Sequence, residues 1–131
     1  MRSRIILTIA ALAIGTVLAA HHSHGQYLET FRDIEGVVKE VHLVVPHSWV
    51  YIEVKDGKAD EPAMWALEAT SRGGLEKVGV ARGYLNPGDK VKVRCHPLRD
   101  GSNGCLLGFL KGPDGVVKNW DGGETPVLSD F

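Results

Sequence analysis

The chain has 131 residues with 15 basic and 16 acidic side chains, a formal net charge of −1. This near balance excludes general nucleic-acid binding, which requires a basic surface. The length allows one hydrophobic core but not two, so we expect a single small domain.

Residues 1 to 20 have the pattern of a secretory signal peptide. Two arginines precede an apolar run, Ile5 to Ala20, that contains only two threonines, one glycine and no acid. The run is shorter than the roughly 20 apolar residues that a bilayer span needs, so no stable membrane span is expected after cleavage. Small residues permit cleavage after Ala19 or after Ala20. The mature chain, with 13 basic and 16 acidic side chains, is expected to be periplasmic or secreted.

The mature chain begins with polar sequence and then changes to a strand pattern. Residues 21 to 35 predict an N-terminal arm, and a β domain is expected over 36 to 118. The first three strands are expected at Gly36 to Val45, Trp49 to Lys55 and Ala63 to Ala69. In the second strand, Val50, Ile52 and Val54 alternate with Trp49, Tyr51 and Glu53, which predicts one buried and one outward face.

The second half of the domain is punctuated by glycines and prolines. Ser71 is a candidate helix cap for a short helix from Gly74 to Val78, and Asn86 to Asp89 has the composition of a tight turn. Two further strands are expected at Lys90 to Pro97 and Cys105 to Leu110. A loose tail is expected over 119 to 131, with attachment to the domain through Trp120 and Val127 as the alternative.

This element order predicts the fold class. Five strands with one short helix between the third and fourth are typical of an OB-like barrel, a five-stranded Greek-key barrel. A β-sandwich is the alternative.

Cys95 and Cys105 are the two cysteines of the chain. Their separation suits a disulfide across one hairpin in an oxidising compartment, which is the favoured interpretation. Two buried free thiols, or a redox or metal-binding pair, are the alternatives, although no Cys-x-x-Cys motif is present.

Several short motifs, taken together, resemble a known family. They are His21-His22-Ser23, Gly36-Val37-Val38, Pro46-His47-Ser48-Trp49, Trp65 to Glu68, Leu75, Pro87-Gly88-Asp89, His96-Pro97 and Arg99-Asp100-Gly101. In order and spacing they resemble the bacterial exported proteins of DUF6152, over almost the whole mature chain. The resemblance implies no particular reaction, because that family has no established activity.

Three of the six histidines, His21, His22 and His24, lie at the start of the mature chain. Cleavage before His21 would join its ring nitrogen and the free α-amino group in one chelate, and a further histidine of the fold would complete the site. Cleavage before Ala20 would instead let the amine, two amides and His22 form a square-planar site. Both geometries favour copper, which prefers tetragonal nitrogen donors. A solvated arm that binds metal incidentally is the plainer interpretation.

His47 and His96 are the candidate ligands within the fold, and His42 is a weaker one. A single exposed histidine is more often an ordinary surface residue. The outward Trp49 and Tyr51, with Arg94 on the fourth strand, form a candidate ligand-binding surface.

Two functional hypotheses follow. The first is a periplasmic copper carrier or buffer with His21 as the principal ligand. The second is a non-catalytic OB-like module that binds a peptide, a saccharide or an envelope-protein partner. No catalytic motif is present, and Ser48 and His47 point to opposite faces of a strand, so we expect no enzyme.

Overall fold

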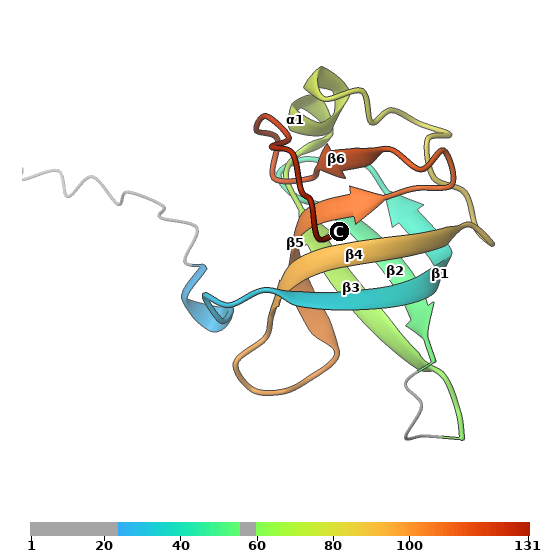
Figure 1. Ribbon diagram of the computed structural model, residues 1–131, viewed down its shortest axis with the longest axis vertical. Coiled ribbons are helices and arrows are strands. Elements are labelled where there is room, and N and C mark those ends of the chain that lie inside the picture. Colours follow the sequence, from blue (N-terminus) through green and yellow to red (C-terminus); the bar gives the residue numbers. More distant parts are fainter. Residues whose placement is uncertain (1–23, 56–59) are drawn as a thin grey trace, which may run out of the picture.

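The computed structural model describes residues 24–55 and 60–131, which form a mainly β domain (Figure 1). The elements in chain order are η1 (His24–Gln26), β1 (Arg32–His42), β2 (Ser48–Val54), β3 (Ala63–Ala69), α1 (Arg72–Lys77), β4 (Lys90–Pro97), β5 (Gly104–Lys111) and β6 (Val117–Asn119). The predicted bounds of β3 and β4 are confirmed.

Five of the strands close into a mixed barrel. Antiparallel pairs join β1 to β2 and β4, β2 to β3, and β4 to β5. The ring is completed by parallel pairing of β3 with β5, and β6 extends the sheet beyond β5. The predicted OB-like barrel is therefore confirmed. The β-sandwich alternative is wrong, because the pairing continues around all five strands and leaves no separation into two sheets.

The alternating pattern of the strands fills the barrel interior. In β2 the residues Val50 and Ile52 are fully buried, while Trp49 and Tyr51 lie half-buried on the outer face, as predicted. Leu67 of β3 is also fully buried in the same core. Each such aliphatic side chain contributes about 1.5–3 kcal/mol through removal of its apolar surface from water.

Strand β1 differs from the prediction at both ends. It begins at Arg32 and ends at His42, whereas its valine-rich stretch predicted Gly36 to Val45. Its first half pairs with β4 and its second half with β2, so polar residues at the start are held by pairing and not by burial. Gly36 lies at the crossover, where a Cβ atom would approach the carbonyl oxygen of Glu53 to 2.7 Å. Only glycine fits this close approach.

The short helix is present, but it starts earlier than predicted. α1 spans Arg72–Lys77, and the Ser71 side chain accepts a hydrogen bond from the Gly74 amide, as expected of an N-cap. Leu75 is fully buried and anchors the helix to the core. The turn before β4 is also as predicted, with Gly88 at a φ of 96°.

Cys95 of β4 and Cys105 of β5 form a disulfide with their Cα atoms 5.7 Å apart. Both residues are fully buried. The predicted bridge across one hairpin is confirmed, and the alternative of two free thiols is wrong. By closing this short loop the disulfide stabilises the domain by roughly 2–3 kcal/mol.

The C-terminal segment is attached to the barrel, in contrast to the loose tail predicted for residues 119 to 131. Trp120 is fully buried, and its backbone exchanges hydrogen bonds with Gly108 and Thr70. Near the end of the chain, Asp130 contacts Arg94. Figure 1 shows β6 beside α1 at one end of the barrel, where the Lys118 ammonium donates to the Val78 carbonyl at 3.1 Å. The apolar burial of Trp120 accounts for the difference.

Candidate functional site

Strand register places a row of outward side chains around one end of the barrel. The members, in order across β1, β2, β3, β5 and β4, are His42, Trp49, Glu68, Leu106 and His96. Glu68 of β3 and His96 of β4 are both paired with Leu106 of β5, so only one strand separates them. Neighbouring strands lie about 4.8 Å apart. Two chemically active side chains thus lie on either side of β5.

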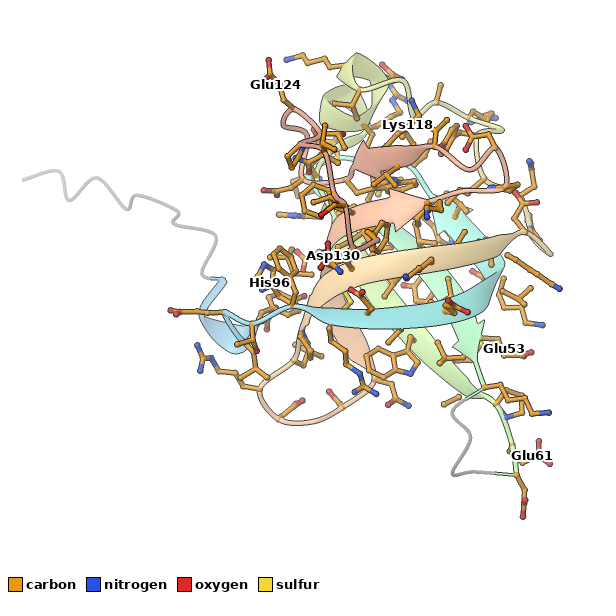
Figure 2. The ribbon with its side chains drawn as sticks, in the orientation of Figure 1. Glu53, Glu61, His96, Lys118, Glu124 and Asp130 are labelled. Atoms are coloured by element: carbon orange, nitrogen blue, oxygen red, sulfur yellow. A yellow bond between two sulfur atoms is a disulfide. The ribbon has the colours of Figure 1, made fainter. Side chains whose placement is uncertain are left out.

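The N-terminal arm, residues 24 to 31 of the described chain, lies against this row. The Leu28 amide donates to the Pro97 carbonyl at 2.8 Å, and the Arg99 amide donates to the Gln26 carbonyl at 2.9 Å. Tyr27, which forms a β-bridge with Leu98, is only 6% exposed. Figure 2 shows His96 at this side of the barrel, close to η1. The fold therefore brings the histidine-bearing terminus to the row.

Three side chains from distant parts of the chain meet beside the arm, and we call them the His47 cluster: His47, Glu68 and Tyr27. The Nδ1 atom of His47 lies 3.2 Å from Glu68 Oε1. The Tyr27 hydroxyl donates a short hydrogen bond to the other carboxylate oxygen, Oε2. The side chains of His47 and Glu68 are 28% and 15% exposed. Glu68 therefore orients both an imidazole and a phenol in a partly desolvated place.

The protonation chemistry of the His47 cluster follows from this geometry. Burial, and then the hydrogen bond to Glu68, raise the pKa of Tyr27 well above its usual value, so the phenol remains a donor. A carboxylate facing Nδ1 of a neutral histidine assigns the proton to that nitrogen and the lone pair to Nε2. A carboxylate–histidine pair of this kind is the usual support of a metal-ligating imidazole.

The other predicted ligands have different surroundings. His21 and His22 lie outside the described residues, and the backbone of His24 begins η1. His96 is half-buried against Phe31, with ring centroids 4.1 Å apart. His42 is exposed, and its Nε2 lies 2.9 Å from Glu40. Among residues 24–55 and 60–131, no three His, Cys, Asp or Glu side chains converge as a complete metal site.

The predicted ligand-binding surface divides into two places. Trp49 and Tyr51 stack on the outer face of β2 with ring centroids 6.5 Å apart, and His42 meets Tyr51 edge-on at 5.7 Å. Arg94 lies elsewhere. Its Nε and Nη2 atoms donate to both carboxylate oxygens of Asp33, and its Nη1 donates to Asp130 at 2.9 Å. We call Arg94, Asp33 and Asp130 the Arg94 cluster.

Sequence reasoning missed the roles of Glu68 and Tyr27. Their hydrogen bond joins residues 41 positions apart. The one signal in the sequence was that Glu68 is the single acidic residue of an otherwise apolar strand. That signal does not indicate which residues Glu68 contacts.

Comparison with known proteins identifies the family. The model of DUF6152, a family of unknown function, matches residues 9–107. The chain belongs to DUF6152. No curated protein and no solved structure matches it.

The DUF6152 match covers the His47 cluster and His96 but ends within β5, before β6 and Trp120. The arm and its contacts therefore lie in the part that is similar to the family. No helix in the described part of the chain is long and apolar enough to cross a bilayer.

Proposed function

We propose that this DUF6152 protein is exported and binds copper, as a carrier or buffer, through its processed N-terminal histidines together with His47. The observation that carries the proposal is the His47–Glu68 pair beside the arm. That pair has the form of an imidazole ligand with its supporting carboxylate. It lies where the arm, through Tyr27, is hydrogen-bonded to Glu68. In the sequence, His21 and His22 come shortly before η1, which begins at His24.

The ligand set follows from the donor chemistry. His21, with the α-amino group freed by cleavage, provides the chelate, and His47 provides the third nitrogen from the barrel. Cleavage before Ala20 makes His22 the ring donor instead, and His24 and His96 are additional candidates on the same side. Nitrogen donors of this number favour Cu(II) over the other divalent first-row metals. The disulfide supports export, because such bonds persist in oxidising compartments.

The Trp49–Tyr51 stack favours a second candidate function. Two aromatic rings on the outer face of an OB-like barrel suit a peptide, a saccharide or an envelope-protein partner. This candidate predicts no effect of copper on stability. The copper hypothesis predicts a stabilisation of RT ln(1 + [L]/Kd), about 2.7 kcal/mol at a free copper concentration 100 times Kd.

The test combines terminal mapping with spectroscopy. Intact mass identifies the first residue of the exported protein, and Cu(II) titration of the metal-free protein is followed by electron paramagnetic resonance. We expect the copper spectrum to show nitrogen hyperfine couplings. These couplings should be reduced in His47→Ala and in His21→Ala, or in His22→Ala if the chain starts at Ala20. Glu68→Gln should bind copper with a roughly 10- to 100-fold weaker affinity.

The matched control is His42→Ala, which removes an exposed imidazole that faces Glu40 and not Glu68. Its copper affinity should equal that of the wild type. Three results would each overturn the proposal: retention of residues 1 to 20 in the working form, a copper spectrum without nitrogen couplings, or equal affinities in the His47→Ala and His42→Ala variants.

A further inference from the structure

A groove beside the arm shares Tyr27 with the His47 cluster but is not lined by His47 or Glu68. It has a volume of about 520 Å³, within the usual range of small-molecule sites. One wall is the arm, and the other is β5 with the ends of β4 and β6. Its aromatic lining consists of Tyr27, Phe31, His96 and Phe109.

The rings on the floor of the groove are arranged around Phe31. Its centroid lies 4.1 Å from that of His96 and 6.1 Å from that of Phe109, with interplanar angles of 32° and 48°. Phe31 is 50% exposed, an unusual degree for a large apolar side chain held by two other rings. Gly108 makes this arrangement possible, because a Cβ atom there would lie 3.0 Å from the Phe31 ring. The half-exposed Phe31 ring is therefore accessible from the groove.

The charges along the groove are mainly negative. Glu29 and Asp121 both line it and are exposed, and within the described chain neither carboxylate has a hydrogen bond or an ion pair. Arg99 is the one basic residue of the lining, and its Nε donates to the Gly25 carbonyl at 2.9 Å. An occupant with a positive charge therefore complements both the carboxylates and the electron-rich ring faces.

We propose that this groove binds a small organic cation of the alkylated-ammonium type. An aromatic lining bordered by carboxylates attracts such a cation through its π faces and desolvates its methyl groups, whereas a metal ion would need nitrogen or oxygen ligands in its inner shell. The proposal can be tested separately from copper binding, because Phe31, Phe109, Glu29 and Asp121 line the groove and are not among the proposed copper ligands.

The test compares two probes of equal shape and different charge. Choline and its uncharged isostere 3,3-dimethyl-1-butanol are titrated into the mature protein, and backbone amide shifts are recorded by NMR. We expect choline to shift amides around Phe31, Gly108 and Phe109, with an affinity roughly tenfold higher than that of the neutral alcohol. Equal affinity of the two probes, or no shifts at millimolar concentrations of choline, would overturn the proposal.

Variants locate the binding. Phe31→Leu keeps an apolar side chain but removes the central ring, and Asp121→Asn removes one charge while retaining its size. Each should weaken choline binding severalfold and leave binding of the neutral alcohol less affected. The matched controls Tyr51→Leu and Asp60→Asn remove a ring and a carboxylate that do not line the groove, and they should bind choline as the wild type does. If the control variants lost choline affinity to the same degree, the cation would bind elsewhere and the proposed site would be wrong.

Discussion

The N-terminal arm and the C-terminal segment are both held against the barrel, but by different chemistry. The C-terminal segment inserts Trp120 into the core, where it is fully buried, and its last residues contact a permanently charged guanidinium. The arm is held by backbone bonds and by the Tyr27 hydroxyl on Glu68, which also faces His47. Apolar burial and fixed charge attach the C-terminal segment, whereas the arm is attached through backbone hydrogen bonds and one hydrogen bond between side chains.

The two clusters also differ in what remains available for chemistry. In the Arg94 cluster the guanidinium donates to two carboxylates and lowers the pKa of both Asp33 and Asp130. All three groups therefore keep one charge state throughout the neutral range. In the His47 cluster the imidazole has the ring nitrogens through which histidine ligates metals. We therefore expect ligand binding beside the N-terminal arm, at the His47 cluster, and not at the Arg94 cluster.

The largest expected effect tests the structural side of this comparison. Trp120→Ala should lower the free energy of unfolding by about 3–5 kcal/mol, because it leaves a large cavity in the core. Urea denaturation measures the change, and Trp49→Ala, which truncates a half-buried ring on the outer face, should cost less. Copper affinity of the folded Trp120→Ala protein should be unchanged. A large loss of affinity would mean that the two segments are coupled.

A smaller effect on stability, but a larger one on binding, is expected at the arm. Tyr27→Phe removes the hydroxyl that donates to Glu68 and should cost about 1–2 kcal/mol of stability. Copper affinity should fall severalfold, since the carboxylate that orients His47 loses its other donor. The matched control is Tyr84→Phe, which removes a hydroxyl 3.4 Å from Asp114 on the exposed surface. Identical copper titrations for the two variants would break the comparison.

The smallest effect is expected from Arg94→Gln, and it depends on pH. Arg94 lowers the pKa of Asp33 and Asp130 below the usual 3.8, so the ion pairs stabilise the fold above that value. Their contribution is lost as the pH falls through the lowered pKa values, because the folded carboxylates then take up protons. Urea midpoints of variant and wild type should therefore differ at neutral pH and converge in acid.

Arg82→Gln, a substitution of an exposed arginine in the loop before β4, provides the control and should show no such convergence. A difference between Arg94→Gln and wild type that persisted in strong acid would assign the stabilisation to packing of the Arg94 side chain. Copper binding should be unaffected in both variants.

Much of the barrel could be predicted from local sequence. The alternation in β2 and β4, the Ser71 cap and the turn at Gly88 depend on side-chain period and backbone preference within a few residues. The prediction was wrong at the start of β1, where Arg32 and Asp33 are polar and exposed and are ordered by pairing with β4. For the C-terminal segment the expectation of a loose tail was wrong, and the alternative of attachment through Trp120 is confirmed, whereas Val127 is exposed. Nothing local to Trp120 indicates which part of the core will receive it.

The candidate site was only partly accessible to the same reasoning. His47 and His96 could be named as ligands from residue type, but their surroundings could not. His47 is 21 positions from Glu68, and Glu68 is 41 positions from Tyr27. The groove around Phe31 likewise combines residues of the arm, β4, β5 and β6. The residues of the His47 cluster and of the groove do not follow any regular spacing in the sequence, so no sequence motif indicates that they lie together.

The sequence by itself determined which residues form strands, which side of each strand is buried, and that two cysteines were placed to pair across a hairpin. These properties arise from periodicity and from turns, which act over short distances along the chain. Only the tertiary structure decided that Glu68 meets both His47 and Tyr27. The contact with His47 depends on the antiparallel pairing of β2 with β3, and the contact with Tyr27 depends on the docking of the arm along Pro97 and Leu98. Register across strands is a non-local property, and it selects which outward side chains become neighbours.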